Sequence, residues 1–344
     1  MAFREAQRGN DLFDIPVAGV PHNAVLDTIN RVVDWAALRS MVAVAYDDSG
    51  AGRPGFDPVW LLKMLLLEYL YGLSDVQVSR ECGDRYSFRA FLGLSPADVP
   101  PDDTRLVRFR NRLRAHGLHH KLMAAINTML AEQGIAARPG SMKIVDATLI
   151  QAAVAPPRRD RNNDDDEHGE SCVDSPKPLS RNAASDPDAD WTIKNKRAHY
   201  GYKLHMAQDA TTGLVTAHAV TKAWVHDTNV LEQLLDGTEK SVLADKGYID
   251  GKRDARLRNK GTMPHVMMRL RKTMSPSTKA TIKTINRAIS RVRSAIEPTF
   301  ANLKRWRHCG RAAYVGIVKV GEQLGWGITA VNLMVAHRWL TKAA

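Results

Sequence analysis

The sequence predicts an α/β protein with a mixed sheet flanked by helices, preceded by an all-helical region. Up to about residue 135, apolar side chains recur at helical spacing between short turn signals. From Ser141 onward the order becomes strand, hairpin, helix, strand, helix, strand and helix, which is typical of an α/β domain. We therefore expect an N-terminal tail at 1–21, a helical region at 22–135 and an α/β domain at 141–344.

The helical region contains several short helices with recognisable ends. Asp57, followed by proline, is the expected N-cap of the run VWLLKMLLLEYLYGL. Ser74 is a second expected N-cap, and Gly93 is expected to end a third helix. The next helix, in DDTRLVRFRNRLRAHGL, is rich in arginine and includes Arg108 and Arg112. The pattern fits a DNA-binding helix-turn-helix unit, and it fits a plain or dimerising helical bundle with a basic surface equally well.

The α/β domain is expected to hold its strands in four stretches. These are SMKIVDATLIQAAV, the hairpin YKLHMAQDATTGLVTAHAVT, SVLADKGYI and TMPHVMMRL. Helices are expected in HDTNVLEQLLDG, with Asp227 as its cap, and in residues 275–306, with an interruption at Pro298. The final stretch KVGEQLGWGITAVNLMVAHRWL predicts an apolar helix that closes the core.

Residues 155–190 differ from the rest of the domain in composition. They carry ten Asp or Glu against five Lys or Arg, with scattered proline and no apolar periodicity. Such a stretch cannot bury enough apolar surface to offset its ordering entropy, so a disordered acidic loop is expected. We interpret its Asp-Asp-Asp-Glu run as solvated acids rather than a metal site.

Charge is the most informative part of the composition. The chain has a net charge of +12, and residues 251–311 hold seventeen Lys or Arg against Asp254 and Glu297. Arg outnumbers Lys there, and guanidinium groups pair well with phosphates, so a nucleic-acid partner is favoured over a merely soluble basic surface. No apolar run is long enough to span a membrane, and three scattered cysteines indicate neither a disulfide framework nor a zinc knuckle. With no secretory signal expected at the N-terminus, we expect a cytoplasmic, nucleoid-associated protein.

Three carboxylates are positioned where a metal site could form. Asp146 lies in the first strand, Asp245 ends a later strand, and Glu297 lies on the long basic helix. Adjacent strands and a packed helix can bring such groups together, and hard divalent cations such as Mg²⁺ prefer oxygen ligands. Two ions would activate an attacking oxygen and stabilise the leaving one. Gly247 is expected to let the chain turn away after Asp245.

Each carboxylate also has a simpler interpretation. A charged Asp146 among apolar neighbours is costly unless it is paired, which favours a functional role. Asp245 could cap a turn, and Glu297 could neutralise a basic helix. Asp209 is the main rival for the second position, although it is expected only to stabilise the hairpin turn.

Taken in order, the stretches IVDATLI, GYKLHMAQDATTGLV, VHDTNVLEQLL, LADKGYID and RVRSAIEPTFANLKRW resemble bacterial insertion-sequence transposases of the DDE class. The match is to the group typified by insertion sequence five, and it extends over roughly residues 20–340. This resemblance implies a ribonuclease-H-like core with Asp146, Asp245 and Glu297 as catalytic metal ligands. The group's helix motif (Tyr, Arg, Glu, Lys) falls on Ser290, Arg293, Glu297 and Lys304, so serine replaces its tyrosine.

The resemblance predicts a transposase that binds terminal inverted repeats, cleaves phosphodiesters with Mg²⁺ or Mn²⁺ (two ions), and joins 3′-hydroxyl ends to target DNA. A homo-oligomer, specifically a dimer, is expected. Two alternatives are a ribonuclease-H-like nuclease without strand transfer and a catalytically silent DNA-binding protein. The expected DNA contacts combine the motif residues with other basic residues of both regions: Arg293, Lys304, Arg305, Arg307, Arg291, Arg108 and Arg112.

Overall fold

The computed structural model describes residues 3–4, 23–46, 55–95, 97–135, 142–156, 186–194 and 196–343. Its N-terminal part is helical apart from a short parallel pair, β1 (Phe3–Arg4) and β2 (Gly55–Phe56). The helices are α1 (Ala24–Val32), α2 (Trp35–Ala43), α3 (Pro58–Tyr71), α4 (Asp75–Asp84), α5 (Tyr86–Leu92), α6 (Asp103–Ala115) and α7 (Leu118–Glu132).

Local sequence signals set the ends of these helices as predicted. The Asp57 carboxylate accepts the Val59 N–H at the start of α3, and Ser74 forms a reciprocal capping box with Gln77 at the start of α4. Gly93 ends α5 at a φ of 80°, a left-handed conformation that favours glycine.

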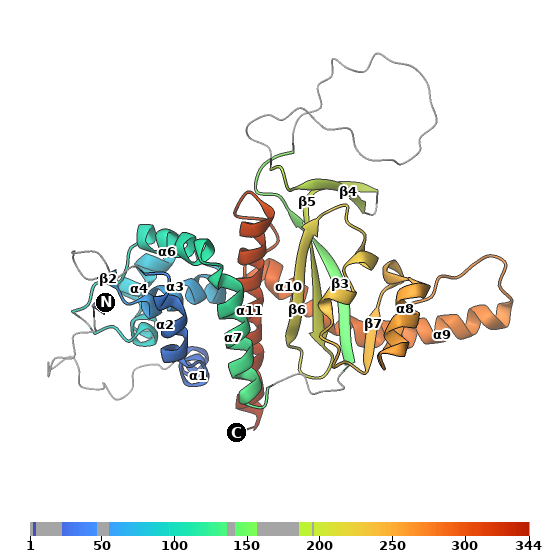
Figure 1. Cartoon of the computed structure of the whole chain (residues 1–344), viewed down its shortest axis with the longest axis horizontal. Coiled ribbons are helices and arrows are strands. Elements are labelled where there is room, and N and C mark those ends of the chain that lie inside the picture. Colours follow the sequence, from blue (N-terminus) through green and yellow to red (C-terminus); the bar gives the residue numbers. More distant parts are fainter. Residues whose placement is uncertain are drawn as a thin grey trace, which may run out of the picture.

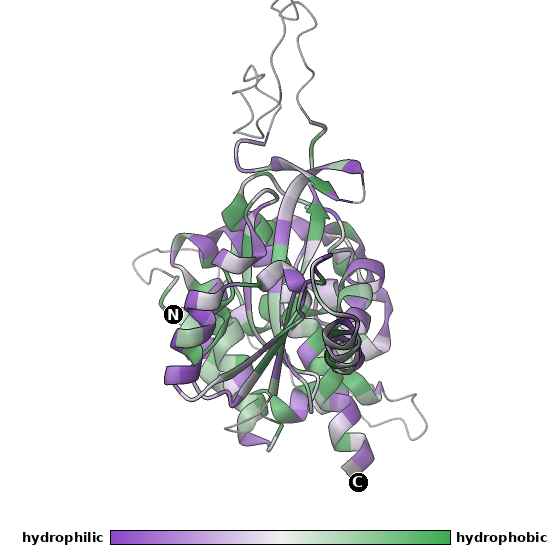
Figure 2. Cartoon of the chain, turned by 90° about the vertical axis from the view of Figure 1, so that its right-hand side faces the viewer, coloured by the Kyte–Doolittle hydropathy of each residue, from purple (hydrophilic) through white to green (hydrophobic). Residues whose placement is uncertain are grey.

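The second part is a mixed sheet with a long central strand. Its strands are β3 (Met142–Gln151), β4 (Asp190–Lys194), β5 (Arg197–Asp209), β6 (Val215–Lys222), β7 (Ser241–Ala244) and β8 (Met263–Val266). β3 pairs antiparallel with β5 on one side and parallel with β7 on the other, and β8 extends the parallel side. β6 and β4 both pair with the long β5, and the β4–β5 hairpin stands clear of the domain at the top of Figures 1 and 2. The predicted mixed sheet flanked by helices, with its helical N-terminal region, is confirmed.

One expected helix is wrong, and one observed helix was not predicted. The stretch HDTNVLEQLLDG forms two 3₁₀ turns, η3 (Asp227–Asn229) and η4 (Glu232–Leu234), rather than one helix. The Asp227 carboxylate lies 3.0 Å from the Lys203 ammonium instead of capping a helix. The segment buries Val230, Leu231 and Leu234 against the sheet, so packing replaces regular helical hydrogen bonds. Helix α8 (Gly251–Asn259) was missed because only one of its apolar side chains, Leu257, is buried.

The expected acidic loop is too long at its C-terminal end. Asp186 is buried and accepts a 2.5 Å hydrogen bond from the Tyr202 hydroxyl. Asp188 accepts the Ile317 N–H at the start of α11 over 2.9 Å. These carboxylates satisfy polar groups that burial would otherwise leave unpaired, which holds residues 186–190 in place. The central part of the expected loop, 157–185, lies outside the described residues.

The long basic segment is divided before its proline. Helix α9 (Pro276–Arg293) ends, a 3₁₀ turn η6 (Ser294–Ile296) follows, and α10 (Glu297–Trp306) then begins. Pro298 lies in the first turn of α10, where its missing N–H costs no hydrogen bond, so proline starts this helix instead of breaking it. In Figure 1, α9 extends away from the sheet at the right.

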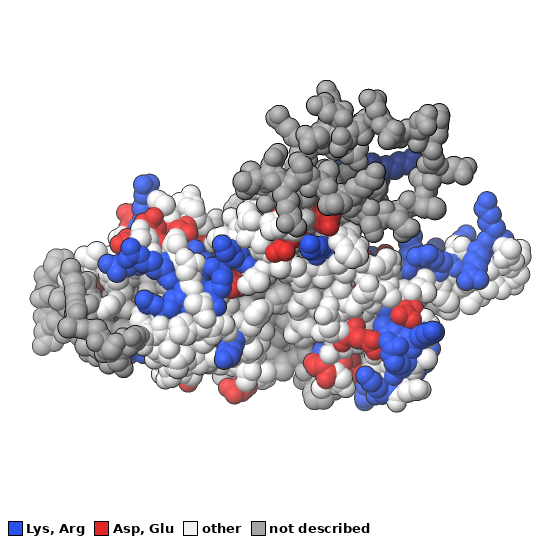
Figure 3. Space-filling view, turned by 45° about the horizontal axis from the view of Figure 1, so that its top comes forward, with Lys and Arg blue, Asp and Glu red and all other residues white. Residues whose placement is uncertain are grey.

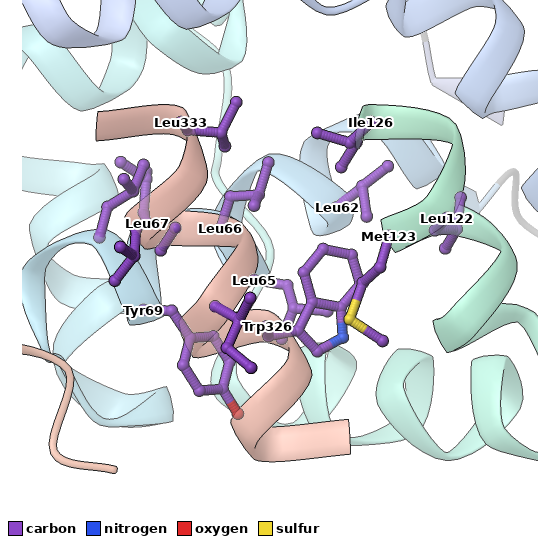
Figure 4. Close-up of a cluster of buried hydrophobic side chains, with 14 of the residues drawn as sticks. Leu62, Leu65, Leu66, Leu67, Tyr69, Leu122, Met123, Ile126, Trp326 and Leu333 are labelled. Carbon is purple, nitrogen blue, oxygen red and sulfur yellow. The ribbon is translucent and has the colours of Figure 1, made fainter. Parts of the chain in front are cut away.

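Helix α11 (Ile317–Ala343) joins the helical region to the sheet. It lies beside α7 and between the helical region and β6 in Figure 1. Toward the helical region it buries Trp326, whose indole N–H donates to His119 over 2.8 Å. Toward the sheet, the Asn332 amide bonds both the N–H and the carbonyl of Val215. Figure 4 shows the side chains of α3, α7 and α11 meeting in this core. None of the helices in the described ranges combines the length and apolar character that a membrane crossing requires.

We predict that Trp326→Ala destabilises the whole chain. Trp326 is 1% exposed, and removing a large buried aromatic side chain costs about 3–5 kcal/mol. Trp339→Ala is the matched control, because that side chain lies on the same helix but is 42% exposed. Chemical denaturation should show a large loss for Trp326→Ala and about 1 kcal/mol for the control. Equal losses would contradict the role assigned to α11.

Candidate active site

The pairing of β3 with β7 places Asp146 beside Asp245. The last paired residues of these parallel strands are Val145 and Ala244, so the two aspartates occupy the next opposing positions. Adjacent strands are about 4.8 Å apart, and opposed residues point to the same face of the sheet. Val145 and Ala244 pack into the core on the other face, which leaves both carboxylates on the face that α9 contacts.

Arg293 connects Asp146 with Glu297. Its guanidinium Nη1 is in contact with Asp146 Oδ2, and its Nη2 lies 3.8 Å from Glu297 Oε1. The Glu297 side chain is 63% exposed at the first residue of α10. Within the residues that the structure describes, no three acids, histidines or cysteines gather closely enough to hold a metal ion. The two aspartates are therefore adjacent, whereas Glu297 meets Asp146 only through Arg293.

The electrostatics of this pair suit a divalent cation. Burial raises the pKa of Asp146, the Arg293 charge opposes that shift, and the nearby Asp245 carboxylate raises the pKa further. A half-buried carboxylate next to a second one requires positive charge, and all three candidate ligands offer the oxygens that Mg²⁺ or Mn²⁺ prefers. The donor set fits such an ion, provided that Arg293 releases Asp146 and the exposed Glu297 side chain turns inward.

A cluster of polar side chains near Asp245 was not predicted from the sequence. Asp227 pairs with Lys203 and lies 3.9 Å from His205 Nδ1, and burial lowers the pKa of His205 to about 4. The same turn holds the chain after Asp245, since the Thr228 hydroxyl donates to the Gly247 carbonyl over 2.9 Å. Spacing gave no sign of this group, because its members come from β5 and from a turn that was predicted to be helical.

Two expectations near the site can be assessed from geometry. Asp209 is fully buried and accepts hydrogen bonds from the N–H groups of Thr211 and Thr212, so it stabilises the hairpin turn as predicted. It opposes Lys143, three residues before Asp146 on β3, and therefore lies about 10 Å from the site. Gly247 lies in a 3₁₀ turn and has no positive φ, so the chain does not need glycine to turn there.

Comparison with known families decides the identity. Residues 138–333, more than half of the chain, match the family described as a transposase DDE domain, and residues 17–112 match a transposase domain, DUF772. The chain belongs to the DDE transposase family. It is a DNA transposase, an enzyme that uses divalent metal to cleave and join DNA strands. The predictions of family and activity are confirmed.

Two solved structures were similar over 94% of this chain. One is a piggyBac transposase synaptic complex with hairpin DNA, with 11% identity, 76% of that chain covered and a TM-score of 0.47. The other is the Mos1 strand transfer complex, with 12% identity, 98% of that chain covered and a TM-score of 0.20. These scores are low, so the placement of the transposase's catalytic residues rests on its own geometry.

The basic residues expected to contact DNA have different environments in the transposase. Arg291, Lys304 and Arg305 are exposed on α9 and α10. Arg307 is buried, and its guanidinium donates to the Leu70 carbonyl near the end of α3. The prediction of a DNA contact for Arg307 is therefore wrong: this side chain joins the two parts of the molecule. Sequence position suggested a continuous basic helix, but Arg307 lies just past the end of α10.

Helix α9 presents a basic surface, which we call the α9 ridge, and no described carboxylate forms an ion pair with the cations of this ridge. It contains no Asp or Glu, and its cations follow one another at four-residue intervals along the helix. They are Lys279, Lys283, Arg287 and Arg291. Figure 3 shows Lys and Arg side chains gathered along this projecting helix, whereas acids are mixed with bases beside it. On α8, for example, Arg256 pairs with Glu232 over 2.7 Å.

The helical region has a second group of basic side chains, also visible in Figure 3. Arg108 and Arg112 of α6 are exposed, and the Arg112 guanidinium lies 4.2 Å from the centre of the Tyr46 ring. Arg110, between them, is buried and pairs with Glu68 and Asp75 over 2.6 Å. Arg110 therefore stabilises the helical bundle, whereas Arg108 and Arg112 face solvent and are accessible to DNA.

We predict that Arg293→Gln strengthens binding of Mn²⁺ to the DNA-free transposase. A unit charge about 5 Å from a divalent ion costs about 1–2 kcal/mol at the dielectric of water, so affinity should rise by about 5- to 30-fold. Arg291→Gln is the control, since it removes an exposed charge from the same helix without touching Asp146. Titration calorimetry would measure both. An unchanged affinity in Arg293→Gln would show that Arg293 does not compete with the metal.

Proposed function

We propose that the chain is an insertion-sequence transposase of the group typified by insertion sequence five, with Asp146, Asp245 and Glu297 as its metal ligands. The observation that carries this proposal is the register of β3 and β7, which sets two aspartates side by side in a chain of this family. Glu297 is the third ligand because it follows Arg293 by one helical turn, and Arg293 already contacts Asp146. Two Mg²⁺ or Mn²⁺ ions would orient an oxygen nucleophile and stabilise the leaving oxygen.

The residues of the chain have separate tasks in this scheme. The aspartates are fixed by strand pairing, so they define where the scissile phosphate must lie. Arg293 is held over Asp146 and would turn to a phosphate oxygen once that carboxylate is neutralised by metal. Lys304, exposed on α10, would contact an adjacent phosphate. Water would attack in the cleavage step and the freed 3′-hydroxyl in the joining step, with no covalent link between protein and DNA.

The proposed partners are the element's terminal inverted repeats and the target DNA, both double-stranded. The α9 ridge and the exposed Arg305 support a duplex contact beside the site, and Arg108 with Arg112 supports a second contact on the helical region. Two DNA ends must meet during joining, so a homodimer acting in the cytoplasm on the nucleoid is proposed. The helical region serves as its DNA-binding or dimerisation part.

We predict that Asp146→Asn, Asp245→Asn and Glu297→Gln each abolish cleavage while DNA binding persists. Each change removes a ligand charge and keeps the side-chain shape. The loss should exceed about a hundredfold, the upper range for residues that only support metal ligands. Asp209→Asn is the matched control and should cleave normally, because its carboxylate only holds a turn.

The assay for these variants should score two products separately. Labelled duplexes of the element's end report cleavage with Mg²⁺, and pre-cleaved ends report joining to a plasmid. A variant that keeps near-normal cleavage would remove its residue from the metal site. Cleavage by the unaltered protein without any joining would favour a nuclease over a transposase.

We predict that binding to duplex DNA weakens steeply with salt. About six phosphate contacts give a log–log slope near −5, because each neutralised phosphate releases counterions. Replacing Lys279, Lys283 and Arg287 by Gln should make the slope shallower by about 2.7. Arg256→Gln is the control, since that arginine already pairs with Glu232. An unchanged slope in the triple variant would show that the α9 ridge does not meet DNA.

A further inference from the structure

Two adjoining cavities lie over the upper half of the sheet, next to the proposed metal site. Their volumes are about 630 Å³ and 510 Å³, within the range of pockets that accept small organic groups. They share Leu149, His199 and Lys304, so they form one groove. We call it the hairpin groove, because β4 and β5 supply much of its lining.

The hairpin groove begins at Thr148, two residues beyond Asp146 on β3. Beyond Val145, β3 has no β7 partner, and residues Thr148 to Gln151 line the cavities instead. At about 3.3 Å per residue, the stretch from Asp146 to Gln151 is about 17 Å long. A strand of DNA that leaves the proposed active site along β3 would therefore enter this groove.

The groove is lined by positively charged side chains. Lys194, Arg197 and Lys304 line the smaller cavity, and Lys304 with Arg311 lines the larger one. Among the described residues, no Asp or Glu lines either cavity. Partial desolvation lowers the pKa of Lys304, and the neighbouring Lys194 ammonium lowers it further. In the described ranges no carboxylate lies within ion-pair distance of either lysine. Two like charges held together in this way favour an anion between them.

The larger cavity also has an aromatic wall. Trp191 of β4 and Tyr200 of β5 are direct partners across the hairpin, with ring centres 5.4 Å apart. The hydroxyls of Tyr200 and Tyr202 are both held by Asp186, which fixes their rings. Aromatic faces beside a positive groove are the features that bind unpaired nucleotides, because a base inside a duplex has no free face to stack.

We propose that the hairpin groove binds unpaired DNA nucleotides next to the scissile phosphate. Their phosphates would contact Lys194, Arg197 and Lys304, and a base would stack on Trp191 or Tyr200. This proposal rests on the proposed function, which supplies the DNA and the position of the cut. It adds a single-strand subsite that is separate from the α9 ridge, which would contact duplex DNA. The groove therefore predicts that the transposase discriminates DNA ends by whether their terminal bases are free.

The test compares two fluorescent 30-bp duplexes of the same sequence, one blunt and one with a five-nucleotide single-stranded overhang. Binding is measured with the full-length protein in Ca²⁺, without cleavage. The unaltered protein should prefer the overhang, and Trp191→Ala should lose about tenfold or more on the overhang alone, as expected for one lost stacked base. Trp191→Phe keeps an aromatic face and should restore the preference, which separates lost stacking from lost folding.

Charge is tested with Lys194→Gln, which should reduce the overhang preference and make its salt slope shallower by about 0.7, the value for one phosphate of a single strand. Trp339→Ala is the matched control: this exposed tryptophan bonds the Thr212 carbonyl in the turn at the other end of β5. The proposal is overturned if the overhang brings no gain, or if Trp191→Ala weakens both duplexes equally. Cleavage of both duplexes with Mg²⁺, followed in parallel, reports independently on the proposed function.

Discussion

The parallel pairing of β3 with β7 is the constraint on which the candidate site depends. A shift of one residue between these strands would turn one aspartate to the opposite face of the sheet, since side chains alternate along a strand. The register is held from the other face, where Val145, Val242 and Ala244 pack with Leu231 and Tyr248. Apolar packing on one face therefore determines the spacing of two charges on the other.

The helices around the sheet determine which side chains lie near the two aspartates. The turn η6 separates α9 from α10, so α9 can project away from the body while α10 packs against the core through Phe300 and Leu303. Arg293 and Glu297 lie on either side of that turn, and a single straight helix would carry them past the sheet in another direction. Helix α11 then fixes the sheet to the helical region, so that both basic surfaces keep a constant relation to the site.

Much of the fold could be predicted from local signals. Asp57, Ser74 and Gly93 act through their own neighbouring backbone, and the structure places them as expected. The errors arise where a residue's partner is distant in sequence. Asp227 pairs with Lys203 and Arg307 bonds a carbonyl of α3, so neither partner is visible from the surrounding residues.

The candidate site shows the same difference between features that the sequence predicts and features that depend on distant partners. Asp146 and Asp245 were predicted from their positions on two strands and from the family resemblance, and the register of β3 and β7 places them side by side. The hairpin groove was not identified, since Trp191 falls in a stretch with no clear pattern and its partner Tyr200 meets it only through the hairpin. The position of Glu297 also depends on the geometry of η6, which composition cannot specify.

Charge balance links the parts of the site. A partly buried Asp146 beside Asp245 needs a cation at every stage, and burial of an unpaired carboxylate would be costly. In the DNA-free protein Arg293 supplies that charge, with Lys194 of the hairpin near enough to lower the pKa of Asp146 as well. Metal ions bound to the carboxylates would release Arg293 and Lys194, and these two side chains would then bind DNA phosphates. Metal binding would then favour DNA binding, because it leaves the two cations without a carboxylate partner. DNA binding would favour metal binding in turn, because it leaves the carboxylates without a cation.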